Sequence, residues 1–150
     1  MSKFLLIFLS FFSVLSDGDI SSISKKNDLR EKANTAFEKQ EYAIAIDCYK
    51  LLRDSFYVNA PELHLNLGQA YYKLNKLDSA SRAYNQAIVE NNKLVNSIAY
   101  LQLGNITFDT ASIELTPTAY TTLKPEKISA AIKAAEFFKK SLIADYTNQE

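Results

Sequence analysis

The chain has 150 residues, of which 47% are apolar, so it is long enough for about one domain with a sizeable hydrophobic core. It contains only three glycines and three prolines, which favours helices over a fold rich in turns. The 17 acidic and 17 basic residues balance, which argues against nucleic acid as a partner, and the single cysteine excludes both an intrachain disulfide and a metal site built from several cysteines.

The first 16 residues have the pattern of a secretory signal peptide. One cation, Lys3, precedes an apolar run from Phe4 to Leu15. This run is too short to cross a bilayer, because a spanning helix needs roughly 20 residues. Val14 and Ser16 occupy the third and first positions before a cleavage site after Ser16. We therefore expect export to a bacterial periplasm or an equivalent compartment, with an uncleaved membrane anchor as the alternative.

The segment after this leader, residues 17–27, is rich in Ser, Asp and Lys and is predicted to be a linker. From residue 28 onward the apolar residues follow a helical spacing with one interruption. A small residue recurs at Ala33, Gly68 and Gly104, at intervals of 35 and 36 residues. This recurrence indicates an internal repeat.

The residues that follow the small positions repeat as well. Ala45 and Ala80 come twelve residues after the first two, and Tyr49 and Tyr84 follow four residues later. A period of about 34 residues with this order of small and aromatic side chains resembles the tetratricopeptide repeat (TPR), a helix pair. Small residues let the two helices cross closely, and the tyrosines fill the space beside the crossing. The resemblance implies an all-α, right-handed solenoid of about three helix pairs.

The third repeat departs from the pattern. A segment rich in Thr and Pro, residues 109–127, separates its first helix from its second and is predicted to be an insertion. The TPR domain is expected at 28–150, with repeats at about 26–60, 61–96 and 97–150. Repeat arrays need a polar helix over their last apolar face, and none follows here. The chain is therefore either an N-terminal fragment of a larger TPR protein with another domain, or it covers this face with a partner or a second copy.

The sequence contains no arrangement of residues typical of catalysis or metal binding. The single histidine, His64, and the single cysteine, Cys48, fall in different repeats, and the glycines are scattered instead of forming a phosphate-binding loop. We expect His64 to be a packing residue and Cys48 to be a small apolar group. No enzymatic activity, cofactor or metal is predicted.

Stacked helix pairs leave a concave groove that is lined by the first helix of each pair. The inward positions carry mostly amide and aromatic side chains, and the amides can bond the main chain of an extended peptide. The sequence therefore predicts a non-catalytic scaffold that binds a protein or peptide partner in this groove. The predicted groove residues are Arg30, Asn34 and Phe37 of the first repeat, Asn66, Gln69 and Tyr72 of the second, and Gln102, Asn105 and Phe108 of the third.

Part of this set resembles the clamp with which chaperone-binding TPR domains hold the terminal carboxylates of a peptide. Arg30, Asn34 and Asn66 match three positions of that clamp. Ile98 and Gln102 stand where the resemblance would require a lysine and an arginine. The clamp is therefore incomplete, because one arginine neutralises only part of two carboxylates.

The leader together with "ANTAFEKQEYAIAIDCYKLL" and "LHLNLGQAYYKLNKLDSASRAYNQAI" is similar to the exported TPR proteins of the Bacteroides aerotolerance (Bat) operons. This resemblance implies a complex in the cell envelope with a membrane-bound von Willebrand factor A protein as the partner. The alternative is a structural module that associates with itself through its uncapped C-terminal face.

Overall fold

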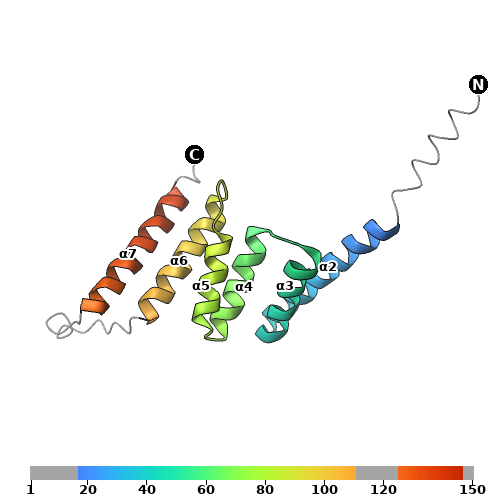
Figure 1. The fold of residues 1–150 in the computed structure, drawn as a ribbon, viewed down its shortest axis with the longest axis horizontal. Helices are drawn as coiled ribbons and strands as arrows, with labels where there is room; N and C mark the ends of the chain where they lie inside the picture. Colours follow the sequence, from blue (N-terminus) through green and yellow to red (C-terminus); the bar gives the residue numbers. More distant parts are fainter. Residues whose placement is uncertain (1–16, 111–124, 147–150) are drawn as a thin grey trace, which may run out of the picture.

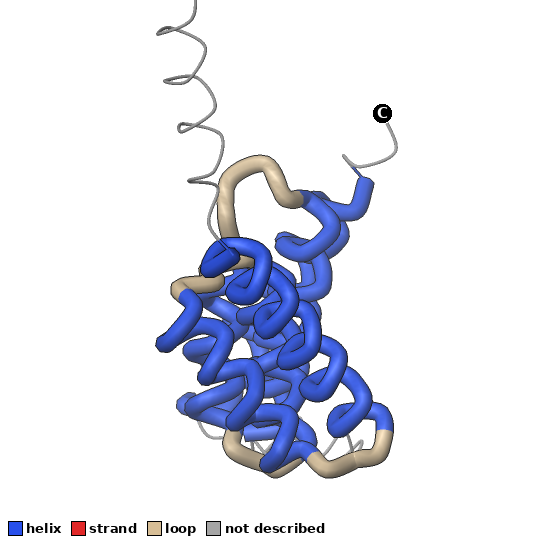
Figure 2. The backbone as a smooth tube through the Cα atoms, turned by 90° about the vertical axis from the view of Figure 1, so that its right-hand side faces the viewer, coloured by secondary structure: helices blue, strands red, loops and turns tan. Residues whose placement is uncertain are grey.

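The computed structural model describes residues 17–110 and 125–146, and all of the regular structure in these ranges is helical. The leader predicted at 1–16 lies outside the described residues, as does most of the insertion predicted at 109–127. The helices lie side by side in chain order, from α2 at one end to α7 at the other (Figure 1). Figure 2, a view turned by 90°, shows helices joined by short loops. The all-α solenoid predicted from the sequence is confirmed.

The helices form three consecutive pairs, and each helix packs against the next one along the chain. α6 ends inside the predicted insertion, at Thr110, and α7 begins inside it, at Pro125. The pairs are α2 (Asp17–Glu38) with α3 (Tyr42–Phe56), α4 (Pro61–Lys73) with α5 (Leu77–Ala87), and α6 (Lys93–Thr110) with α7 (Pro125–Tyr146).

Residues 17–27 are helical, although their composition predicts a linker. They form the first half of α2, whose second half packs against α3. A helix that is already held at one end extends readily through Ser and Lys, and the only glycine in this segment, Gly18, lies at its start. The ammonium of Lys26 also lies 6.0 Å from the centre of the Phe56 ring, which connects this segment to the end of α3. The composition of residues 17–27 does not predict this contact with α3.

The small and aromatic residues of the repeat meet across each helix pair. A Cβ atom added to Gly68 would lie 2.7 Å from Cδ1 of Tyr84, and one added to Gly104 would lie 2.6 Å from Cδ1 of Phe138 and closer still to its Cε1. Both distances are shorter than a van der Waals contact. Each glycine therefore allows an aromatic ring of the second helix to rest directly on the backbone of the first.

Two hydrophobic clusters run along the stack. The first joins α2, α3 and α4 around Leu52 and Leu67, and the second joins α4, α5 and α6 around Tyr84 and Leu103. Tyr71 packs against both clusters, so the core is continuous from the first repeat to the third. Burial of each large apolar side chain stabilises the fold by about 1.5–3 kcal/mol.

The turns within the first two pairs have the same geometry. Gln40 and Asn75 adopt positive φ values of 62° and 55°, and the next amide donates a hydrogen bond back into the first helix of the pair. These bonds run from Glu41 N to Ala36 O at 2.8 Å and from Lys76 N to Tyr71 O at 2.9 Å. The repeat therefore extends to the backbone of the turn as well as to the side chains of the core.

Candidate peptide-binding pocket

Four of the predicted groove residues line one pocket between the first two repeats. The pocket has a volume of about 220 Å³. Side chains three and four residues apart share one face of a helix, so the first helices of both pairs direct these residues toward the same space. The lining residues are Asn34, Phe37 and Glu38 of α2, Tyr49 of α3, and Asn66 and Gln69 of α4.

Tyr49 forms the floor of the pocket and orients one of its amides. The Tyr49 hydroxyl donates a 2.8 Å hydrogen bond to Oδ1 of Asn34. Burial raises the pKa of this hydroxyl, and a hydrogen bond with the Asn66 side chain partly opposes that rise. The hydroxyl is therefore protonated at neutral pH. Because Asn34 uses its oxygen in this bond, its amide nitrogen remains as a donor toward a ligand.

Glu38 is the charged residue among those that line the pocket. Its carboxylate forms no ion pair or hydrogen bond with another residue of the described ranges. Arg30 is exposed on the same helix, and its guanidinium lies 3.5 Å from Oδ1 of Asn27, outside the pocket lining. The pocket therefore combines amides with one carboxylate, and an anionic ligand would be repelled by Glu38.

Residues 61–94 match the family model of the tetratricopeptide repeat. The match begins at the first residue of α4, passes through α5 and ends at the start of α6. This segment is therefore similar to a tetratricopeptide repeat. This match supports a TPR protein, and TPRs are non-catalytic repeats that generally mediate protein–protein interaction. Asn66 and Gln69 of the pocket lie inside the matched segment.

The remaining predicted groove residues lie elsewhere. The hydroxyl of Tyr72 donates a 2.9 Å hydrogen bond to Oδ2 of Asp109, which connects α4 to α6, and this bond is the main cause that raises the pKa of Tyr72. Gln102, Asn105 and Phe108 are half-buried on α6 and are not among the residues that line the pocket. The structure thus brings together four of the six predicted residues of the first two repeats, and it leaves Arg30, Tyr72 and the predicted residues of the third repeat outside the pocket.

The sequence analysis missed three residues that shape this surface. Glu38 lies one helical turn after Asn34, so both side chains share one face of α2. The spacing of four residues in the sequence already predicts this. The repeat pattern predicts a core position for Tyr49. Its hydroxyl, which a phenylalanine would lack, indicates a hydrogen-bond partner as well. Asp109 was assigned to the insertion, and only the length of α6 places it opposite Tyr72.

His64 and Cys48 are both buried and lie outside the pocket. Nε2 of His64 lies 2.6 Å from Oδ1 of Asn59, and burial is the main cause that lowers the pKa of the imidazole, as expected for a packing residue. The described residues contain no group of three or more side chains placed to bind a metal ion. None of the described helices is long and apolar enough to cross a membrane.

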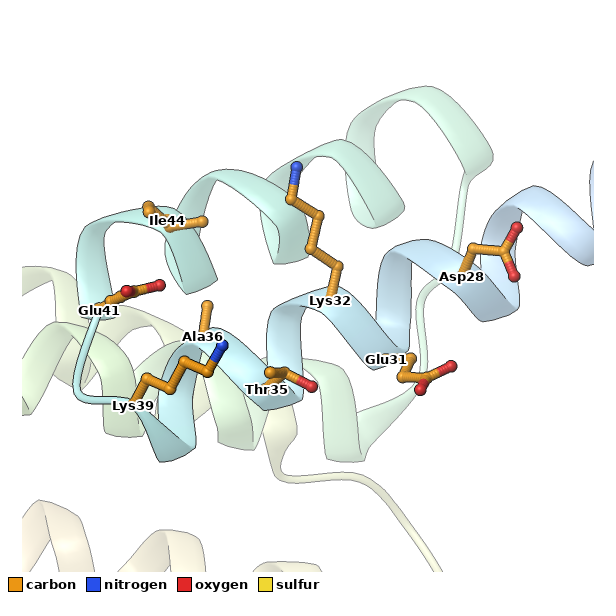
Figure 3. Close-up of a pocket in the computed structure, with 8 residues that line it drawn as sticks. All are labelled: Asp28, Glu31, Lys32, Thr35, Ala36, Lys39, Glu41 and Ile44. Atoms are coloured by element: carbon orange, nitrogen blue, oxygen red, sulfur yellow. The ribbon is translucent and has the colours of Figure 1, made fainter.

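A second hollow, of about 440 Å³, lies on the outer side of the first repeat (Figure 3). None of the predicted groove residues lines it. Its charged residues have both signs, so it lacks the uniform charge that would attract a specific ion. The residues that line it are Asp28, Glu31, Lys32, Thr35, Ala36 and Lys39 of α2, with Glu41 and Ile44 at the start of α3.

Proposed function

We propose that the pocket between α2 and α4 binds the main chain of an extended segment of a partner protein, and that the chain acts as a scaffold. The observation that carries this proposal is that amides of two successive repeats, Asn34, Asn66 and Gln69, line one pocket together with Phe37. Together these amides offer donors and acceptors that match the C=O and N–H groups of a peptide, with Asn34 contributing the donors of its amide nitrogen. Helix packing holds these groups in place, so binding costs little conformational entropy on the TPR side.

The negative charge of Glu38 restricts the charge of the segment that the pocket can bind. Glu38 would repel a terminal carboxylate. Arg30, the cation among the predicted groove residues, lies outside the pocket lining and does not offset this repulsion. The bound segment is therefore an internal stretch of a chain, neutral or basic where it passes Glu38. A C-terminal acidic peptide of the kind held by a carboxylate clamp is a poor fit.

The proposal is tested with peptides selected against the full chain from a displayed library of random sequences. The side chain of Gln69 forms no hydrogen bond with another described residue, so Gln69→Ala should leave the melting temperature unchanged. It should weaken binding by about 2–10-fold, the value of one net hydrogen bond. Gln86→Ala, at an exposed position of α5, is the matched control. Equal affinities for wild type and Gln69→Ala, or an equal loss in Gln86→Ala, would refute the assignment of the pocket.

We place this interaction in the cell envelope, with a membrane-bound von Willebrand factor A protein as the partner. The leader pattern at 1–16 and the resemblance to exported Bat TPR proteins support both points. Affinity capture with the full chain, from an envelope fraction and from a cytosolic fraction of the same cells, tests them together. A von Willebrand factor A protein recovered from the envelope fraction is the expected result, and specific capture from the cytosol alone would contradict it.

A further inference from the structure

A charged residue follows the inward amide of each repeat by one helical turn. These charged residues are Glu38 on α2, Lys73 on α4 and Asp109 on α6, and all three are exposed. Side chains four residues apart share one face of a helix, so each charge lies on the same face as an amide. The sign therefore alternates from repeat to repeat. The amides that precede the charges by four residues are Asn34, Gln69 and Asn105.

The two carboxylates of this series differ in their partners. Oδ2 of Asp109 accepts a 2.9 Å hydrogen bond from the Tyr72 hydroxyl. Glu38, in contrast, lines the pocket and forms no ion pair or hydrogen bond with another residue of the described ranges. A cation that enters the pocket would therefore find the Glu38 carboxylate unpaired within this part of the chain.

The charge of Glu38 acts on the floor of the pocket. Burial is the main cause that raises the pKa of Tyr49, and the negative charge of Glu38 adds to that rise. The hydrogen bond with the Asn66 side chain lowers the same pKa, so the Asn66 nitrogen is its donor. The oxygen of Asn66 remains as an acceptor. The pocket therefore offers a carboxylate and an amide oxygen, both of which attract a positively charged donor.

Phe37 places an aromatic ring beside these acceptors. Its ring packs nearly perpendicular to that of Tyr42, at an interplanar angle of 69° and a centroid distance of 5.3 Å, which holds it in place. The side chain is only half-buried and lines the pocket. An aromatic ring attracts a cation through its quadrupole, and the aliphatic stem of a lysine or arginine packs on such a surface. The acceptors and the ring together match a side chain with an apolar stem and a positive end.

We propose that the pocket selects a basic side chain, arginine or lysine, of the bound segment, with Glu38 as its ion-pair partner and Phe37 beside its stem. This inference rests on the function proposed for the pocket and adds the class of side chain that is recognised. Lys73, one turn after Gln69 on the same face of α4, would repel a second cation. The bound segment therefore carries its basic residue at one position, over the first repeat, and is not basic throughout.

The first test compares peptides selected from a displayed random library against three forms of the full chain. With the wild type, arginine or lysine should be enriched at one aligned position by at least about threefold over the unselected library. The enrichment should disappear with Glu38→Gln. It should persist with Glu31→Gln, the matched control, which removes the same charge from the hollow on the outer side of α2 (Figure 3).

Three outcomes of this selection would overturn the proposal. The first is a set of wild-type binders without the enrichment, and the second is the same enrichment against Glu38→Gln. The third is a selection that yields no binding peptide, which would overturn the function proposed for the pocket as well.

The second test measures the pairing itself by calorimetric titration of one selected peptide. Glu38→Gln in the chain, or glutamine in place of the basic residue of the peptide, should each weaken binding by about 3–5-fold, the upper range for an exposed ion pair. Both changes together should weaken binding no more than one of them, because either change already breaks the pair. Losses that multiply would show that the two groups act independently and would overturn the proposal.

Titration of Gln69→Ala with the same peptide separates this proposal from the function on which it rests. An affinity that falls with Gln69→Ala and not with Glu38→Gln would keep the pocket as the binding site and overturn the selection of a basic side chain. An affinity that neither variant changes would place the peptide elsewhere and refute both proposals.

Discussion

Two glycines of the array lie under aromatic rings that differ in their freedom to move. Tyr84, above Gly68, is fully buried, whereas Phe138, above Gly104, is half-buried. A methyl group at either glycine gains about 1 kcal/mol of helix propensity but must displace the ring. Gly68→Ala should lower the free energy of unfolding by about 1–2 kcal/mol through overpacking, and Gly104→Ala should lower it by less. Urea unfolding of both variants measures this difference, and a stabilised Gly68→Ala would show that the ring moves freely.

The hydroxyl of Tyr84 is buried and has no hydrogen-bond partner among the described residues. Burying such a group costs free energy, so Tyr84→Phe should raise the free energy of unfolding by about 1 kcal/mol. Burial also raises the pKa of Tyr84 above its usual 10.0. Ionisation of Tyr84 therefore leaves the free energy of unfolding unchanged below pH 10 and lowers it as the pH rises further, because the tyrosine ionises first in the unfolded state.

Unfolding by urea at neutral pH and at about pH 11 tests both points. Tyr84→Phe should be more stable than the wild type at neutral pH and should lose less stability on the change to alkaline pH. Tyr57→Phe, at a position that is 87% exposed, is the control and should follow the wild type. A destabilised Tyr84→Phe would mean that the hydroxyl has a partner, such as a bound water molecule.

Sequence spacing predicted which residues are small and which are aromatic at the helix crossings, since a repeat preserves the positions that pack. It did not predict the hydrogen bonds from Tyr49 to Asn34 and from Tyr72 to Asp109. Those bonds join different helices, and their distances depend on how the helices cross. Spacing along one helix carries no information on that crossing.

At the scale of the elements, α3 ends on a tyrosine in a conformation that favours glycine. Tyr57 has φ 53°, and the following amide, Val58 N, bonds Leu52 O at 3.1 Å. A left-handed conformation costs a residue with a side chain about 1–2 kcal/mol, and Tyr57 makes little contact that would offset this cost. Tyr57→Gly should therefore raise the free energy of unfolding by about 1 kcal/mol.

Thermal unfolding of Tyr57→Gly and of the control Tyr57→Ala measures this effect. The alanine variant keeps the unfavourable left-handed conformation, so only the glycine variant should gain stability. A gain of the same size in both variants would trace the effect to the tyrosine side chain instead of the backbone.

The boundaries of the elements were harder to predict than their existence. The helical period predicts the six helices of the described residues, but the composition of residues 17–27 predicts a linker, whereas they form part of α2. Their Ser-rich composition has no apolar period, and the contact of Lys26 with Phe56 comes from a residue 30 positions away. Local composition cannot reveal support from so distant a residue.

At the scale of the molecule, the stack of helices places an amide-lined pocket between its first two pairs. Of nine predicted groove residues, four line the pocket, because inward positions recur in every repeat while the stacking of neighbouring repeats decides which of them meet.

The pocket is tested most directly by NMR, because the side-chain amides of Asn34, Asn66 and Gln69 give their own signals. The full chain would be titrated with a peptide selected against it, and these signals compared with those of Gln86 and Asn85 on the exposed side of α5. We predict saturable shifts of the three pocket amides and unchanged signals on α5. Saturable binding that leaves the pocket amides unshifted would contradict the account.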